Sequence, residues 1–237
     1  MLKLNQFEKY SIEKIIPLCP DTKIFRLRPV SGSPWQFLPG QFVFIHILDD
    51  AGNSVVKKPF SIASAPGEPC LEFCIKLIHG NFTGRLENLE EGAVVGIEKP
   101  AGHFSFGGEG RAGFIAGGTG IAPIISMLRV AARDKLEGKF CFFYSAKSAD
   151  HILYRKELEE LQKGNPAIKV VVTLTQEEGA WSGERGRVDA AMISRHLPDA
   201  AKFSWWICGP TEMVKTMRQN LESLGADPKK MKMEGWG

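Results

Sequence analysis

The sequence predicts two domains of different fold class, a small antiparallel β-barrel followed by an α/β domain built on a parallel sheet. The first half contains short strand-like segments that are separated by turn sequences. The pattern changes after GGEG at 107–110, and from there strand-like runs alternate with helix-like stretches. A length of 237 residues suits two modest domains. We therefore expect residues 1–110 to form the first domain and residues 111–237 the second.

The strand-like segments of the first half are rich in β-branched and aromatic residues, as strands usually are. Turn sequences with Gly, Pro, Asp or Asn divide them at 31–34, 49–53 and 65–69. One short helix is expected at 82–89, with Thr83 as its capping residue. The expected strands are 22–29, 41–48, 58–64, 70–78 and 93–100.

The second half has the alternating order of strands and helices that produces parallel sheets covered by helices on both faces. Its apolar runs are short and each is followed by an amphipathic stretch. The expected strands are 113–118, 139–146, 168–175 and 204–210, and the expected helices are 121–133, 154–163, 189–197 and 212–225.

Composition excludes several classes of protein. The net charge of +3 is too small to indicate nucleic-acid binding, although the positive excess lies in residues 111–237. The first nine residues contain no apolar run typical of a secretory signal, and no run of about 18 apolar residues predicts a membrane span. Five cysteines without a signal argue against a disulfide framework, and Cys70 and Cys74 alone are a poor metal signature. We expect a cytoplasmic protein without a metal site.

The strongest local motif is AGGTGIAP at 116–123, which follows a strand and begins a helix. In that context backbone N–H groups and the helix dipole face a phosphate. Gly117, Gly118 and Gly120 permit a close approach of the backbone and positive φ, and Pro123 suits the first helical turn. A tight βα turn without a ligand is the alternative, and three glycines before the helix favour phosphate.

Three further motifs have both a structural and a functional interpretation. CGP at 208–210 ends a strand of the α/β domain, where ligands bind in open sheets, although Cys208 could also be a buried cysteine before a turn. KPFSIAS at 58–64 could hold a phosphate and a flat ring, or be an edge strand containing Pro59. Trp236, near the end of the sequence, either fills the core or covers a ligand.

Taken in order, KPFSIAS, GNFTGRL (80–86), GGTGIAP, CGP and the terminal E-x-W resemble the ferredoxin–NADP⁺ reductase family across nearly the whole chain. The resemblance implies a six-stranded antiparallel Greek-key β-barrel that binds FAD, here residues 1–110. It also implies a Rossmann-like domain that binds NAD(P), here residues 111–237.

The resemblance assigns cofactor-binding roles in the barrel. In the 58–61 segment, Lys58 would meet the flavin phosphate, Phe60 would pack on the isoalloxazine, and Ser61 would bond near N5 as a catalytic residue. Pro59 belongs to the same cofactor-binding segment. Lysine stands where arginine is usual, and an ammonium cannot make a bidentate phosphate contact. The other matches are Ile75, Lys76 and Leu77 on a flavin-side strand, and Gly80 and Thr83 at the pyrophosphate.

In the second domain the resemblance implies that Gly118, Thr119 and Gly120 cradle the dinucleotide pyrophosphate. Cys208 and Gly209 would flank the nicotinamide. Glu234 and Trp236 match the terminal acid and aromatic, with Trp236 covering the flavin until the nicotinamide displaces it. Cys208, Glu234 and Trp236 thus join Ser61 as candidate catalytic residues.

The implied activity is hydride transfer from NAD(P)H to bound FAD, followed by electron transfer to ferredoxin, flavodoxin or an oxygenase component. Alternatives are a free-flavin reductase and a non-catalytic flavin- or dinucleotide-binding subunit. Ser145 lies at the end of the second strand of the α/β domain, and Lys147 and Arg155 follow it, where a cationic set suits the 2′-phosphate of NADPH. Arg185 and Arg187 add to this set, whereas Gln176 stands where NADP-binding relatives often have arginine. NADPH is therefore favoured over NADH.

Overall fold

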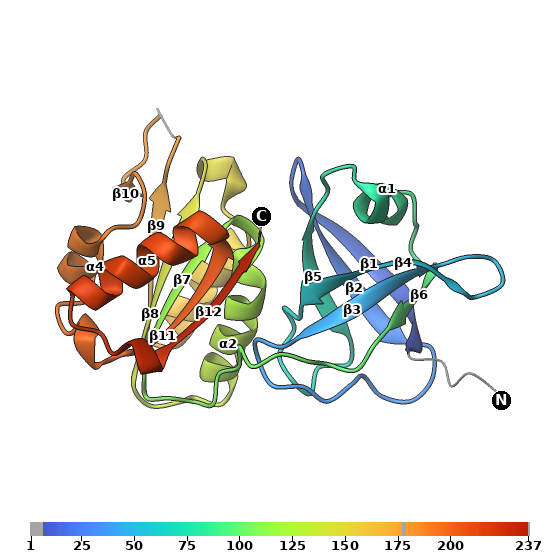
Figure 1. Ribbon diagram of the computed structural model, residues 1–237, viewed down its shortest axis with the longest axis horizontal. Helices are drawn as coiled ribbons and strands as arrows, with labels where there is room; N and C mark the ends of the chain where they lie inside the picture. Colours follow the sequence, from blue (N-terminus) through green and yellow to red (C-terminus); the bar gives the residue numbers. More distant parts are fainter. Residues whose placement is uncertain (1–6, 177–178, 237) are drawn as a thin grey trace. The chain divides into compact units, whose positions relative to one another are not determined.

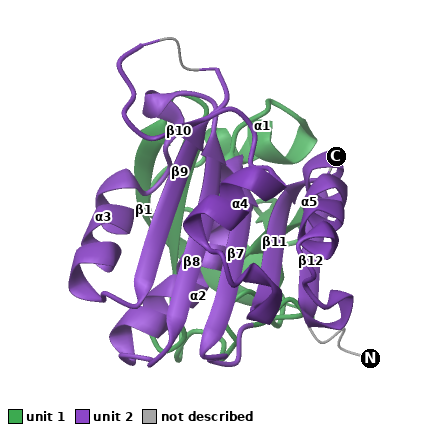
Figure 2. Cartoon of the chain, turned by 90° about the vertical axis from the view of Figure 1, so that its left-hand side faces the viewer, with its two compact units in different colours: residues 1–105 green, residues 106–237 purple. Residues whose placement is uncertain are grey.

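The computed structural model describes residues 7–176 and 179–236. The chain divides into two compact units, Met1–Ser105 and Phe106–Gly237, which Figure 2 shows in green and purple. The first unit contains a six-stranded antiparallel sheet and the second a six-stranded parallel sheet with helices. The expected fold class is confirmed for both units.

The first unit is a Greek-key barrel with strand order β4-β3-β6-β1-β2-β5, in which all neighbouring strands are antiparallel. The N–H of Ala63, just after β4, donates to the carbonyl of Glu72 in β5 at 2.7 Å and joins the two ends of this order. The elements, labelled in Figure 1, are β1 (Glu8–Cys19), β2 (Thr22–Pro29), β3 (Phe42–Leu48), β4 (Ser54–Ser61), β5 (Leu71–Lys76), α1 (Asn81–Glu87) and β6 (Val94–Ile97).

Strand β1 is absent from the strands predicted from the sequence. Its charged residues, such as Glu13 and Lys14, interrupt the apolar pattern, and its register with β2 shifts between Ile12 and Lys14. Tyr10 and Ile12 nevertheless alternate into the barrel core and are 0% and 1% exposed. A bulged strand with one solvated face loses the regular period of two that a sequence search detects.

The start of helix α1 differs from the prediction. Gly80 is the N-cap, and Thr83 lies inside the helix as its third residue. Its hydroxyl accepts a hydrogen bond from the Gly80 N–H at 3.2 Å. The prediction of Thr83 as N-cap was wrong because its side chain performs the reciprocal half of a capping box, which satisfies the N–H of the cap residue.

The second unit is a doubly wound parallel sheet of order β10-β9-β8-β7-β11-β12. From β7 the chain moves in one direction through β8, β9 and β10, and then crosses back to β11 on the other side of β7. Its elements are β7 (Arg111–Gly117), η1 (Gly118–Gly120), α2 (Ile121–Arg133), β8 (Lys139–Ala146), η2 (Ala149–His151), α3 (Arg155–Gly164), β9 (Ile168–Leu174), β10 (Glu184–Arg185), α4 (Ala190–His196), η3 (Ala200–Lys202), β11 (Ser204–Pro210), α5 (Thr211–Ser223), η4 (Pro228–Lys230) and β12 (Met231–Trp236).

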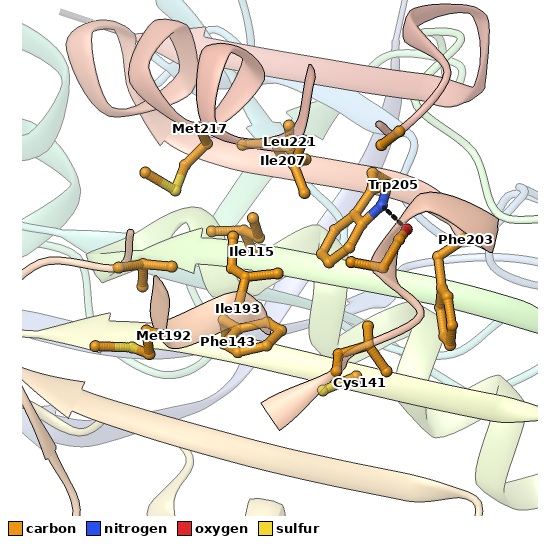
Figure 3. Packing of buried hydrophobic residues seen from close by; sticks show 14 of the residues in the cluster. Ile115, Cys141, Phe143, Met192, Ile193, Phe203, Trp205, Ile207, Met217 and Leu221 are labelled. Carbon is orange, nitrogen blue, oxygen red and sulfur yellow. Dashed lines mark hydrogen bonds between the residues drawn. The ribbon is translucent and has the colours of Figure 1, made fainter. Parts of the chain in front are cut away.

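Alternate strand residues of this unit pack on opposite faces of the sheet. Ile115, Phe143 and Ile207 share a core cluster with Met217 and Leu221 of α5, and Figure 3 shows these side chains facing one another. On the opposite face of the sheet, the neighbouring strand residues Phe114 and Trp206 pack with Phe106 at ring-centroid distances of 5.7 and 5.3 Å. Burial on both faces explains why strands such as β8 are almost continuously apolar.

The sheet places a topological switch point between β7 and β11. In open α/β sheets a crevice forms beyond the carboxyl ends of the strands where the order reverses, and ligands bind there. No helix within residues 7–176 and 179–236 is long and apolar enough to cross a membrane.

Candidate cofactor sites in the two units

In the barrel, the KPFSIAS and GNFTGRL segments meet through two aromatic rings. Phe60 of β4 packs against Phe82 of α1 with ring centroids 5.2 Å apart and planes at 42°. Phe82 is buried, whereas Phe60 is partly exposed and packs on the barrel core. The pair therefore presents a partly exposed aromatic face between β4 and the start of α1, where a flat ring could stack.

Strand alternation separates the two lysines of β4. Lys57 forms an ion pair with Glu98 at 2.7 Å and lies 4.6 Å from the centre of the Phe44 ring. Lys58 is exposed and lies two residues from Phe60, on the same side of the strand. β4 stands at one end of the strand order, where Pro59 removes no essential ladder bond. Lys58 can thus offer its charge to a ligand beside Phe60.

The side chains of the predicted flavin-side strand are either buried in the barrel core or held in an ion pair. Ile75 and Leu77 are 1% and 5% exposed in the barrel core. Lys76 points outward, and its ammonium pairs with Asp21 at 2.7 Å. Ser61 is half-buried at the end of β4, opposite Phe42. Whether these residues contact a flavin stays a prediction.

In the second unit, the glycine loop lies at the switch point, between β7 and the 13-residue helix α2. Gly118 has φ of +53°, which strains other residues. A Cβ atom on Gly120 would collide with the carbonyl group of Cys208 and lie 2.8 Å from Cη2 of Trp236. The N-terminus of α2 has no side-chain cap, so its N–H groups are suited to a phosphate.

The loop is adjacent to both remaining motifs of the α/β domain. In the sheet register, Cys208 of β11 lies beside Ala116 of β7 on one side and Glu234 of β12 on the other. Trp236 lies beside Pro210 and is 42% exposed, so it is not a core residue. The structure therefore brings the glycine loop, CGP and the terminal Glu-x-Trp together within one unit.

Burial sets the protonation states of two of these side chains. Burial raises the pKa of the Cys208 thiol well above 9, and the nearby Glu234 raises it further. Cys208 therefore stays a neutral thiol near pH 7 and is a poor nucleophile. Burial also raises the pKa of Glu234 from 4.5 to about 7. Glu234 can consequently hold or release a proton near neutral pH.

Two of the residues predicted for the nucleotide phosphate lie at the carboxyl end of β8. Ser145 is half-buried beside Gly117, and Lys147 is exposed just after the strand. The N–H of Gln176 donates to the Lys147 carbonyl at 2.8 Å, so these two residues lie side by side just beyond the carboxyl ends of β8 and β9. Arg155 starts α3 and pairs with Glu159 at 3.5 Å. Arg185 instead donates to the carbonyls of Gly179 and Trp181.

Three residues that border these sites were not predicted. Phe82 lies inside the GNFTGRL motif, and its aromatic character was the available signal. Tyr144 of β8 donates its hydroxyl to the Gly118 carbonyl at 3.2 Å, and Met213 of α5 packs beside Gly117 and Gly209. The contacts of Tyr144 and Met213 depend on the packing of distant segments, so no local sequence pattern predicts them.

The chemistry of both sites fits the cofactors that the motifs suggest. The barrel offers a cation beside an aromatic face, and the α/β unit offers a glycine cradle that a Cβ would fill. Among the residues that the structure describes, no three His, Cys, Asp or Glu side chains gather in a way that could hold a metal ion.

The chain matches two known protein-family models, one in each unit. Residues 9–106 match the family model described as an oxidoreductase FAD-binding domain. Residues 114–219 match the one described as an oxidoreductase NAD-binding domain.

Individual relatives agree with these matches. The chain is 31% identical over 228 residues to ferredoxin--NADP reductase B of Sorangium cellulosum, covering 92% of each protein. It is 31% identical over 227 residues to the reductase component of propane 2-monooxygenase of Rhodococcus jostii, covering 90% of this chain and 59% of that protein. The fold matches the FAD/NAD-binding domain of nitric oxide dioxygenase from Vibrio cholerae with a TM-score of 0.89 at 19% identity, covering 98% of this chain and 100% of that one.

Proposed function

The chain belongs to the ferredoxin–NADP⁺ reductase family, and on that premise we propose that it transfers electrons from NADPH to ferredoxin or flavodoxin. It is an FAD- and nicotinamide-dinucleotide-dependent oxidoreductase. The observation that carries the proposal is the convergence of the glycine loop, Cys208 and Glu234 at the switch point of the second unit.

We assign FAD to the barrel unit, where Lys58 would meet a phosphate and Phe60 would pack on the ring system. Gly80 and Thr83 would contribute at the pyrophosphate, and Ser61 would donate a hydrogen bond to the flavin. A flavin held there would supply hydride acceptance and one-electron transfer, which the protein's own side chains cannot provide. The barrel residues bind and orient the cofactor.

We assign the dinucleotide to the second unit, with its pyrophosphate on Gly118, Thr119 and Gly120. Cys208 would pack beside the nicotinamide as a neutral thiol, and no covalent bond to the protein is required. Glu234 would hold a proton at its carboxyl group below about pH 7. Trp236, against Gly120, would exclude water from the same place until the nucleotide binds.

The preference for NADPH rests on Lys147 and Ser145 at the end of β8. An exposed ammonium there suits a 2′-phosphate, and the first acidic residue after the strand, Asp150, comes three residues after Lys147. Arg185 contributes less than its charge suggests, because its guanidinium holds the carbonyls of its own loop. Comparing kcat/KM for NADPH and NADH tests this preference, and a clear advantage for NADH would refute it.

The electron acceptor is tested by turnover. We expect NADPH oxidation to be stimulated strongly by ferredoxin or flavodoxin and weakly by free FMN. The name of the Rhodococcus relative favours an oxygenase component as the second candidate. Equal or greater stimulation by an oxygenase component or by free flavin would refute ferredoxin or flavodoxin as the acceptor.

Removing the Tyr144 hydroxyl should loosen the glycine loop. In Tyr144→Phe, the Gly118 carbonyl loses a donor that helps to hold φ of +53°. A hydrogen bond contributes about 1 kcal/mol, so we expect KM for NADPH to rise about threefold to fivefold. Tyr10→Phe is the matched control, because the Tyr10 hydroxyl accepts from Trp35 N–H in the barrel. An unchanged KM in Tyr144→Phe would contradict this role.

The raised pKa of Glu234 predicts a pH-dependent stability. Because the pKa of Glu234 is about 7 in the folded protein and its ordinary value is 4.5, the unfolded state loses this proton first as pH rises. The free energy of unfolding should therefore fall between pH 4.5 and 7, by up to about 2 kcal/mol for a half-buried group. The free energy of unfolding of Glu234→Gln should lack this pH-dependent fall. Denaturant titrations from pH 5 to 8 measure it, and parallel curves for both proteins would contradict it.

A further inference from the structure

The side chain of Met213 occupies the space beside two glycines at the switch point. A Cβ atom on Gly117 would lie 2.8 Å from Met213 Sδ and 3.4 Å from its Cε. A Cβ atom on Gly209 would collide with Met213 Cε and lie 3.4 Å from Sδ. Because Gly117 ends β7 and Gly209 lies near the end of β11, one thioether contacts the ends of both strands that flank the crevice.

The local fold explains how the side chain reaches this position. α5 begins directly after CGP, and Met213 is its third residue. Met213 is partly buried and packs against the core cluster that Figure 3 shows, which contains Ile115, Ile207 and Met217. Methionine is unbranched and adapts to irregular gaps. The residue is thus anchored in the core and fills the gap between the two strand ends.

We propose that Met213 is a positioning residue for the nicotinamide half of the dinucleotide. It fixes the separation between the loop that begins at Gly117 and the Cys208–Gly209 segment, which also approach closely, since a Cβ on Gly209 would lie 3.3 Å from Gly117 N. The adenosine half is assigned to Ser145 and Lys147 at the end of β8 and does not depend on this separation. The inference rests on the proposed function and refines it.

The test separates the two halves of the nucleotide. Met213→Ala should raise KM for NADPH about tenfold, because misplacing binding groups by a fraction of an ångström weakens oriented contacts. The inhibition constant of 2′,5′-ADP, which carries only the adenosine half, should stay within twofold, as should the FAD content. Met213→Leu, which keeps most of the volume, should restore most of the affinity.

Met217→Ala is the matched control, because Met217 is a buried methionine of the same helix that is 2% exposed in the core. It should lower the melting temperature without changing KM. Gly209→Ala offers a second route, since the severe overlap of its new methyl group is with the flexible thioether tip, whereas Gly117 N would lie 3.3 Å away. It should raise KM like Met213→Ala, and the double variant should be no worse than either one.

Several outcomes would overturn the proposal. These are an unchanged KM in Met213→Ala, an equal rise in Met217→Ala, or a parallel rise in the 2′,5′-ADP inhibition constant. If Met213→Ala does not fold, Gly209→Ala gives the same comparison. A wild-type protein that neither binds nor oxidises NADPH or NADH would refute the proposed function itself, and this result is visible before any variant is made.

Discussion

Replacing Gly120 with alanine is expected to reduce kcat/KM for NADPH by about a hundredfold or more, because a small displacement of the loop misplaces the reacting ring. The new methyl group would overlap the Cys208 carbonyl group, whose carbon would be 2.7 Å away, and would lie 2.8 Å from the Trp236 ring. Backbone atoms at a strand end cannot move aside cheaply, so the glycine loop must shift. Steady-state oxidation of NADPH with ferricyanide measures the effect.

Gly164→Ala is the matched control for this variant. Gly164 ends α3, and apart from its chain neighbours and the backbone of its own helix, no atom of the described residues lies within 4 Å of the Cβ that would be added there. It should leave kcat/KM and FAD content unchanged. Gly120→Ala should keep its FAD, because the barrel is untouched. Wild-type kinetics in Gly120→Ala would show that the loop does not hold the dinucleotide.

Replacing Phe60 with alanine is expected to weaken FAD binding by about tenfold to a hundredfold, the range found when one stacking aromatic is removed from a flat-ring site. The ring stands on Phe82 at 5.2 Å and is partly exposed, so its loss removes the flat surface without opening a large cavity. Fluorescence titration of the apoprotein with FAD gives the dissociation constant.

Phe44→Ala controls for the loss of an aromatic from the same sheet. Phe44 lies beside Pro59 on the neighbouring strand, and its ring faces Lys57 at 4.6 Å. Its removal should change stability slightly and leave the FAD dissociation constant within twofold. Equal FAD affinity in Phe60→Ala and the wild-type protein would place the isoalloxazine elsewhere.

The features that the sequence predicted are those with a local physical signal. The parallel strands were identifiable because both faces are buried, so segments such as 139–146 are apolar throughout. The glycine loop was identifiable because close approach and positive φ require glycine, as Gly118 and Gly120 show. CGP was assigned to a strand end, which β11 confirms.

The features that were missed depend on tertiary context. β1 carries a bulge and a solvated face, and β12 is a short strand whose apolar pattern is interrupted by Lys232 and Glu234. The cap of α1 was misassigned because a threonine can cap a helix or complete a capping box. The contacts of Tyr144 and Met213 with the glycine loop exist only after distant segments pack together.

The central claim is that one polypeptide binds a flavin and reduces it with a nicotinamide dinucleotide. The absorption spectrum of the purified protein, recorded anaerobically before and after addition of NADPH, tests it most directly. We expect a yellow protein whose visible flavin absorption bleaches on addition of NADPH, as expected for reduction of a bound flavin. A colourless protein that takes up no added FAD, or a yellow one that neither NADPH nor NADH bleaches, would contradict the account.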